Sequence, residues 1–175
     1  MGQRTLEITD ISSPLKAAFT ISRGAKTSAE TIRVTLREGD AIGRGECVPY
    51  PRYGETQSGV RAAIEALRAR IEGGLSREAL QAEMPAGAAR CALDCALWDL
   101  EAKQSGRPVW KLAGLPEPKP IETAVTVSLD TAEAMAEAAR SKPSRLLKLK
   151  LGGPEDLERI EAVHAARPDA RLIVD

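Results

Sequence analysis

The chain has 175 residues, with 25 lysines and arginines against 25 aspartates and glutamates, so its formal net charge is zero. A protein that neutralises several phosphates normally carries a basic excess, so this balance argues against a nucleic-acid partner. No apolar run approaches the ~20 residues that span a bilayer, which argues against a membrane protein. The N-terminal segment shows no apolar signal-peptide core, so we expect a cytoplasmic protein.

The first part of the chain predicts a small sheet. Leu6 and Ile8 alternate with polar residues in a short opening strand. Residues 32–36 alternate with a period of two, residues 38–40 carry turn chemistry, and residues 41–48 return as the hairpin partner.

Three helices are predicted next. Residues 57–72 carry an apolar stripe and end at Gly73, and residues 76–83 begin at Ser76 as the N-cap. Residues 87–104 are apolar nearly all round, which is typical of a central, enclosed helix.

Several polar and sulfur-containing residues are given structural roles. Arg90 and Asp94 are spaced i,i+4, so we interpret Asp94 as half of an intrahelical ion pair rather than as a catalytic acid. His164, the single histidine, falls on a surface-patterned helix and is expected to be exposed. The three cysteines lack the geometry for a disulfide or a zinc site, so we expect small buried thiols. They are Cys47, Cys91 and Cys95.

The pattern changes at Pro116, Pro118 and Pro120, where closely spaced prolines forbid a helix and indicate a stiff connector between domains. Beyond them, evenly spaced strand and helix patterns alternate, which is typical of a parallel α/β fold. The predicted strands cover residues 121–129, 146–151 and 171–175, and the helices cover 131–141, with Asp130 as N-cap, and 154–166, with Pro154 at the first position.

The strand LLKLKL carries the strongest chemical signal. Strand alternation places Lys148 and Lys150 on one face, and Asp175 ends the next parallel strand. Burial and a like charge both lower the pKa of a lysine, which is how lysines become general bases. A carboxylate beside them is a ligand for a hard cation such as Mg²⁺. The alternatives are an edge strand protected by lysines and an aspartate that caps a following helix.

Four stretches together resemble the N-terminal half of an enolase-superfamily enzyme, and in particular the dipeptide epimerases. They are GECVPYPRYGET (residues 45–56), PAGAARCALDCALWDLEAK (residues 85–103), LLKLKL (residues 146–151) and PDARLIVD (residues 168–175). The lysine strand followed by a strand-terminal aspartate is a superfamily-level signal, and the first two stretches are more specific to the epimerases. The resemblance covers essentially the whole chain.

The resemblance implies a fold and a function. Residues 1–115 would form an α+β capping domain, followed in residues 116–175 by the first βα units of a (β/α)₇β (TIM-like) barrel, cut off at the end of the third strand. The implied function is Mg²⁺-dependent epimerisation of dipeptides such as L-Ala-D/L-Glu, as in peptidoglycan recycling. The expected partner is the small dipeptide, and a homo-oligomer is left open.

The resemblance also implies site residues. Lys150 would be the base on one face of the substrate, Lys148 would lie near the substrate carboxylate, and Asp175 would be the first of three Mg²⁺ ligands. Arg23 would hold the acidic side chain of the substrate, although it equally fits a solvated loop arginine. Thr126 fits both a substrate contact and barrel filler.

The chain departs from the family in its length. The other metal ligands and the lysine on the opposite face would follow Asp175, so we expect residues 1–175 alone to be inactive and poorly soluble. The alternatives are another enolase-superfamily enzyme (a muconate-type cycloisomerase, an acid-sugar dehydratase or o-succinylbenzoate synthase) and a non-catalytic binding module.

Overall fold

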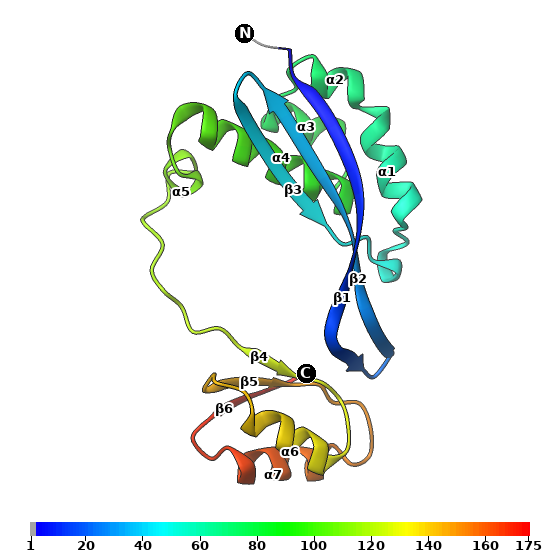
Figure 1. The fold of residues 1–175 in the computed structure, drawn as a ribbon, viewed down its shortest axis with the longest axis vertical. Coiled ribbons are helices and arrows are strands. Elements are labelled where there is room, and N and C mark those ends of the chain that lie inside the picture. Colours follow the sequence, from blue (N-terminus) through cyan, green and yellow to red (C-terminus); the bar gives the residue numbers. More distant parts are fainter. Residues whose placement is uncertain (1–2) are drawn as a thin grey trace. The chain divides into compact units, whose positions relative to one another are not determined.

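The computed structural model describes residues 3–175, which divide into two compact units (Figure 1). Unit 1 holds the chain up to Ser13 together with Ala29–Pro118, and unit 2 holds Pro14–Ser28 together with Lys119–Asp175. The domain limit expected at residue 115 stays a prediction, and the tip of the N-terminal hairpin groups with the second unit. Within residues 3–175 no helix is both long and apolar enough to cross a membrane.

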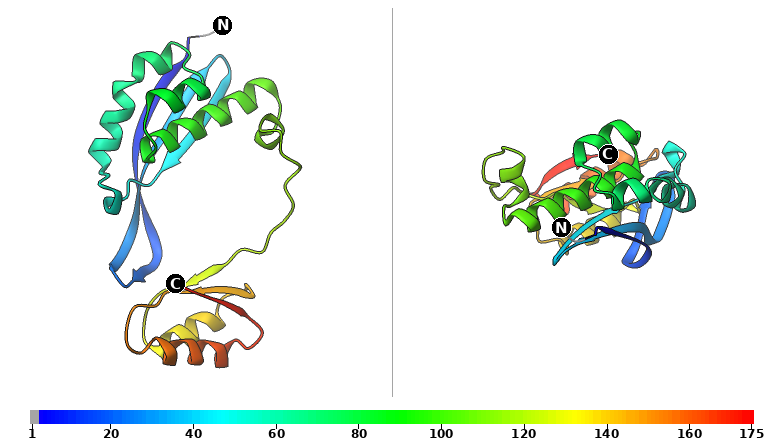
Figure 2. Two further views of the ribbon diagram at one scale, coloured as in Figure 1. Left: turned by 180° about the vertical axis from the view of Figure 1, so that it is seen from behind. Right: turned by 90° about the horizontal axis from the view of Figure 1, so that it is seen from above.

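Unit 1 contains an antiparallel sheet in the order β1-β2-β3, with its helices on one face (Figures 1 and 2). The first two strands are much longer than the sequence pattern predicts, and the parts of them that lie within Pro14–Ser28 belong to unit 2. The elements are β1 (Thr5–Ile21), β2 (Gly24–Glu38), β3 (Ala41–Cys47), a 3₁₀ turn (Pro51–Tyr53), α1 (Gln57–Ala66), α2 (Arg68–Glu72), α3 (Arg77–Glu83), α4 (Ala88–Ser105) and α5 (Val109–Leu112).

Helix α4 packs directly on β3 because two glycines leave room for it. A Cβ on Gly43 would lie 2.2 Å from the carbonyl oxygen of Ala96, and a Cβ on Gly45 would lie 2.0 Å from that of Ala92. Real Cβ atoms do not approach backbone so closely, so only glycine permits this spacing. The small side chains of Ala92 and Ala96 are fully buried at the same contact.

The prediction that α4 is enclosed all round is wrong. One face buries alanines and leucines, but Cys91 and Cys95 are exposed on the other. Trp98 is half-buried, and the guanidinium carbon of Arg77 lies 3.4 Å from its ring centroid, a cation–π contact. On the second face of α4, therefore, Arg77 covers Trp98, and Cys91 and Cys95 face solvent.

The expected ion pair on α4 is also absent from the described residues. Asp94 accepts a hydrogen bond from the side-chain amide of Gln81 (Nε2) at 3.1 Å, and Arg90 donates to the backbone carbonyl of Met84 at 3.2 Å. Arg90 supplies a donor to a backbone carbonyl at the end of α3, whereas Asp94 accepts from a side chain of α3. Tertiary partners thus replace the local i,i+4 pairing.

The N-terminus of α4 is held by Glu55, from the motif GECVPYPRYGET. Its carboxylate accepts hydrogen bonds from the amide of Ala88 at 2.6 Å and from the amide of Tyr50 at 3.0 Å. The Ala88 amide and then the Tyr50 amide lower the pKa of Glu55, as expected for a carboxylate at a helix N-terminus. This part of the motif therefore has a structural role that the sequence pattern did not indicate.

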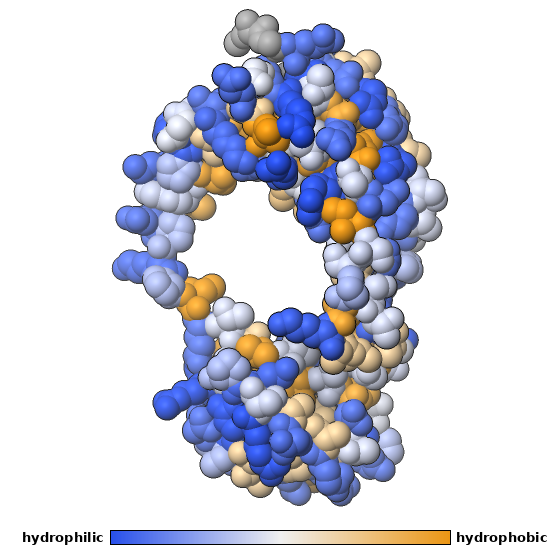
Figure 3. Space-filling model, viewed as in Figure 1, coloured by the Kyte–Doolittle hydropathy of each residue, from blue (hydrophilic) through white to orange (hydrophobic). Residues whose placement is uncertain are grey.

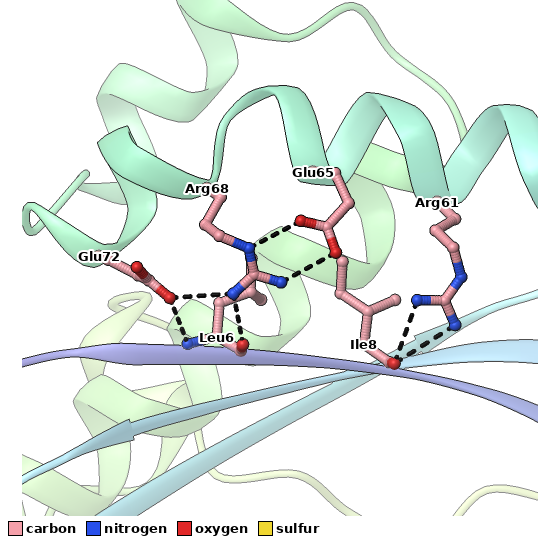
Figure 4. A network of polar contacts seen from close by, with 6 residues as sticks. All are labelled: Leu6, Ile8, Arg61, Glu65, Arg68 and Glu72. Carbon is pink, nitrogen blue, oxygen red and sulfur yellow. Dashed lines mark hydrogen bonds and ion pairs between the residues drawn. The ribbon is translucent and has the colours of Figure 1, made fainter.

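Side chains of α1 and α2 cover the outer edge of β1 (Figure 4). Arg68 donates to the carbonyl of Leu6 at 2.7 Å, the carboxylate of Glu72 accepts from the amide of Leu6 at 3.2 Å, and Arg61 donates to the carbonyl of Ile8 at 3.3 Å. An edge strand exposes unpaired backbone groups that favour aggregation, and these contacts satisfy them. The sequence pattern predicts one helix over residues 57–72. The structure has two helices there, with a break at residue 67.

The cysteines are not all buried, which corrects the sequence-based expectation. Cys47 is buried in β3, whereas Cys91 and Cys95 are exposed on α4. Burial, followed by the neighbouring Cys91, raises the pKa of Cys47 to about 11. All three are free thiols.

We expect this difference to appear in thiol reactivity. At pH 8 only about a thousandth of Cys47 would be thiolate, the form that reacts with alkylating agents. Iodoacetamide should therefore label the exposed Cys91 readily in the native protein and leave Cys47 largely unmodified, as measured by peptide mass spectrometry. Cys95 should label more slowly than Cys91, because burial, followed by the neighbouring Cys91, raises its pKa. In denaturant all three should label at similar rates. Native labelling of Cys47 as fast as that of Cys91 would contradict the buried position.

Unit 2 contains a parallel sheet in the order β4-β5-β6 with two helices on one face (Figure 1). Leu147 and Leu149 are completely buried on that face, and Met135 and Val163 cover them from the two helices. The elements are β4 (Val125–Val127), α6 (Ala132–Arg140), β5 (Leu146–Leu149), α7 (Asp156–Ala166) and β6 (Arg171–Val174).

Three details of unit 2 differ from the sequence-based expectation. The first strand is limited to β4, and Ile121, expected to begin it, is 87% exposed. The side chain that caps α6 is Thr131, which accepts from the amide of Ala134, rather than Asp130. Helix α7 begins at Asp156, so Pro154 precedes it instead of occupying its first position. His164 is exposed, as predicted.

The surface mixes polar and apolar residues. On the face drawn in Figure 3, hydrophobic residues lie in separate groups among hydrophilic ones. On β6, at the end of the strand order, Ile173 and Val174 are 41% and 56% exposed. The expected low solubility of residues 1–175 stays a prediction.

Candidate active site

Three charged side chains meet at the carboxyl ends of β5 and β6. Lys148 Nζ lies 2.7 Å from Asp175 Oδ2, and Lys150 Nζ contacts the same oxygen. The side chain of Lys150 is 20% exposed, against 37% for Lys148 and 42% for Asp175. The residues singled out from the sequence are thus brought together as one cluster, in which two ammonium groups share one carboxylate oxygen.

Strand geometry explains why these side chains converge. Leu147 and Leu149 point to the buried helical face, so alternation turns Lys148 and Lys150 to the opposite face. The ladder continues past the formal strand ends, because Lys150 donates its amide to Val127 at 3.0 Å and Asp175 donates its amide to Leu149 at 3.1 Å. These bonds fix the backbone that carries the cluster.

The lysines also determine the charge state of the carboxylate. Hydrogen bonds from Lys148 first and Lys150 second lower the pKa of Asp175 to about 2. Asp175 is therefore ionised throughout the neutral range, and the cluster carries an anion between two cations. Such a concentration of charge at the carboxyl ends of parallel strands is typical of a site that binds a polar ligand.

The other two candidate residues also belong to unit 2. Thr126 pairs in register with Lys148 on the neighbouring strand and is half-buried. Arg23 lies in the two-residue turn between β1 and β2 and is exposed, and no carboxylate of residues 3–175 forms an ion pair with it. Their roles as substrate contacts stay predictions.

The turn that carries Arg23 is attached to the strand ends by contacts that the sequence did not reveal. The amide of Leu129, just beyond β4, donates to the carbonyl of Thr20 at 3.1 Å. Gly152, just beyond β5, lies against Ser22. Gly152 and Gly153 directly precede the helix predicted at residues 154–166, and nothing in the local pattern indicates a contact with a segment about 130 positions earlier.

These residues supply only part of a binding site for a divalent cation. The ionised carboxylate of Asp175 is the hard oxygen donor that Mg²⁺ prefers. However, no group of three or more potential ligands forms within residues 3–175. The chemistry of Asp175 fits one ligand of such an ion, and the remaining ligands are not supplied by the described residues.

Fold and strand-end cluster together define the class of protein. An antiparallel three-stranded sheet with helices, followed by parallel βα units, is the arrangement of the N-terminal region of enolase-type enzymes. Residues 3–114 match the family described as "Mandelate racemase / muconate lactonizing enzyme, N-terminal domain". The chain belongs to this family of the enolase superfamily, which confirms the resemblance seen in the sequence.

Curated relatives include dipeptide epimerases. The L-Ala-D/L-Glu epimerase of Escherichia coli (strain K12) is 43% identical over 175 residues, covering 98% of the chain and 54% of the relative. The N-acetyl-D-glutamate racemase of Pseudoalteromonas sp is 40% identical over 149 residues, covering 82% of the chain and 46% of the relative. The chain thus spans about half the length of the curated relatives it matches.

Solved structures give the same result. An enolase family member from Agrobacterium tumefaciens, with bound sodium and L-Ala-L-Glu and an ordered loop, superposes with a TM-score of 0.93 at 47% identity over 98% of the chain and 53% of that structure. The dipeptide epimerase of Enterococcus faecalis V583, complexed with Mg and L-Leu-L-Tyr, gives 0.89 at 27% identity over 100% and 53%. The chain is homologous to dipeptide epimerases, which are isomerases.

Proposed function

We propose that the protein carrying this chain is a Mg²⁺-dependent epimerase of dipeptides such as L-Ala-D/L-Glu. The observation that carries the proposal is the cluster of Lys148, Lys150 and Asp175 at adjacent parallel strand ends, in a chain 43% identical to an L-Ala-D/L-Glu epimerase. Removing an α-proton requires a base beside the α-carbon and positive charge beside the substrate carboxylate, and these residue types supply both.

Each residue of the cluster has a separate task in this proposal. Lys150, the less exposed lysine, accepts the α-proton of the C-terminal residue of the dipeptide at its Nζ when unprotonated. Lys148 holds a positive charge near the substrate carboxylate. Asp175 orients both amines through one oxygen and is one ligand of Mg²⁺. When bound, Mg²⁺ supplies positive charge that makes the α-proton more acidic.

Arg23 and Thr126 are proposed to contact the substrate. Arg23 has an exposed guanidinium without a carboxylate partner among the described residues, which suits it to a bidentate bond with an acidic side chain. Thr126 stands beside Lys148 in the sheet register and offers a hydroxyl on the next strand. The substrate proposed is therefore one that ends in glutamate.

Racemisation of N-acylated glutamate is a second candidate function. It is supported by the 40% identity to an N-acetyl-D-glutamate racemase. The reacting part is the same, an acylated glutamate whose α-proton is removed, so the same lysine cluster serves both reactions. The group that acylates the glutamate nitrogen is what distinguishes the two substrates.

The proposal is tested by hydrogen exchange in the protein expressed over its whole natural length. In D₂O with Mg²⁺, we expect L-Ala-D-Glu to acquire deuterium at the glutamate α-carbon, and mass spectrometry measures this gain. Exchange should stop when EDTA removes the metal. Residues 1–175 expressed alone should show no exchange. Faster exchange with N-acetyl-D-glutamate would favour the second candidate, and no metal-dependent exchange with either compound would refute the proposal.

A further inference from the structure

The end of β5 meets the tip of the N-terminal hairpin at a glycine. A Cβ built on Gly152 would lie 2.4 Å from Cβ of Ser22 and 3.2 Å from its Cα. The first distance is closer than real Cβ atoms approach, and the clashing Ser22 atom is the base of its side chain rather than a flexible end. The hairpin tip therefore rests where an alanine at position 152 would have to displace it.

A second contact ties the same tip to the neighbouring strand. The amide of Leu129, two residues beyond the end of β4, donates to the carbonyl of Thr20 at 3.1 Å. The tip is thus held at two points, by a hydrogen bond from the end of β4 and by close packing at the end of β5. Ser22, which makes the packing contact, is followed directly by Arg23 in the turn.

We propose that Gly152 is a positioning residue for Arg23: its missing side chain lets the Ser22-Arg23 turn rest against the ends of β4 and β5, on the strands that carry Thr126 and the lysines. This inference rests on the proposed function, in which Arg23 binds the acidic side chain of the substrate. An added methyl group at position 152 displaces the turn and strains the Thr20–Leu129 hydrogen bond, so that Arg23 is held less firmly near the site.

The chain offers a matched control in the adjacent residue. The amides of Gly152 and Gly153 both donate to the carboxylate of Asp156, each at 3.1 Å, and neither glycine has a positive φ that would disfavour alanine. A Cβ on Gly153, however, meets only the end of the Arg159 side chain, at the ordinary distance of 3.6 Å. Gly152→Ala and Gly153→Ala therefore differ mainly in the contact with Ser22.

The first measurement is limited trypsin digestion of the whole-length protein, which reports opening of the tip at the Arg23–Gly24 bond. Overpacking of this kind should raise the cleavage rate of Gly152→Ala by about tenfold, whereas Gly153→Ala should stay within about twofold of the parent protein. In a Ser22→Gly background, where the clashing Cβ is gone, Gly152→Ala should have little further effect. Equal cleavage of Gly152→Ala and Gly153→Ala in the protein that retains Ser22 would overturn the inference, as would a tenfold effect of Gly152→Ala that survives in the Ser22→Gly background.

The second measurement separates this inference from the proposed function. Gly152→Ala should raise KM for L-Ala-D-Glu several-fold with a smaller change in kcat, and Ser22→Gly should restore KM. Arg23→Ala is the reference. If it raises KM and Gly152→Ala does not, the inference is overturned. If Arg23→Ala leaves KM unchanged, the proposed substrate contact of Arg23 is wrong, and the digestion result alone decides whether Gly152 positions the turn.

Discussion

Replacing Lys150 with alanine is expected to lower kcat for epimerisation of L-Ala-D-Glu by about 10²- to 10⁴-fold, the usual contribution of a general base. In the proposed mechanism Lys150 Nζ is the group that takes the α-proton on one face of the substrate. Alanine has no group that can accept this proton. Lys148, two residues earlier on the strand, keeps its own contact with Asp175 in the variant. The measurement is the rate at which the whole-length protein converts L-Ala-D-Glu to L-Ala-L-Glu.

The design includes controls for folding and for charge. Lys150→Ala removes one ion pair to a partly exposed carboxylate, so the thermal unfolding midpoint should change little. Lys119→Ala, which removes an exposed lysine in the loop before β4, should leave kcat unchanged. Epimerisation that persists in a folded Lys150→Ala protein at more than a tenth of the parent rate would show that Lys150 is not the base.

Replacing Gly45 with alanine is expected to be among the most destabilising small changes in unit 1. The added Cβ would lie 2.0 Å from the carbonyl oxygen of Ala92 and 2.6 Å from the amide nitrogen of Ala96, both backbone atoms of α4. Backbone cannot rotate away as a side chain can, so the helix must move off the sheet and loosen the core between them. Overpacking of this kind costs about 1–3 kcal/mol in free energy of unfolding, and occasionally more.

The matched control for Gly45 is its neighbour on the other face of β3. The side chain of Arg44 is exposed. Its backbone amide donates a hydrogen bond to the carboxylate of Asp99 at 2.8 Å, and an alanine at this position retains that bond. Arg44→Ala should change the free energy of unfolding by about 0.5 kcal/mol or less. Urea denaturation of both variants measures the difference. Equal stabilities would mean that β3 and α4 are not packed as closely as the glycine contacts require.

Periodicity predicted the elements that bury a regular stripe. The alternation of residues 32–36 corresponds to part of β2, and that of residues 146–151 to β5, which ends at Leu149. The apolar stripe of residues 57–72 corresponds to α1 and α2. The N-cap at Ser76 is also observed, with its hydroxyl accepting from the amide of Ala79. These features succeed because a repeating side-chain pattern and a local cap depend only on nearby residues.

Predictions failed where the contacts of a residue depend on partners that are distant in sequence. Asp94 accepts a hydrogen bond from Gln81 and forms no ion pair with Arg90 among the described residues, and the two cysteines on α4 are exposed. The capping of α4 by Glu55 depends on a loop that returns to the helix from 33 positions away. Composition and spacing carry no information on such contacts, since they arise only when the layers pack.

By itself, the sequence determined the βα alternation, the common face of Lys148 and Lys150, and the position of Asp175 at a strand end, because each follows from local chain geometry. Only the tertiary structure decided that the two amines share one carboxylate oxygen, that the Arg23 turn rests against Gly152, and that Gly43 and Gly45 admit α4. The physical reason is distance along the chain. Backbone dihedrals propagate a pattern over a few residues, whereas these contacts join segments that only close packing brings together.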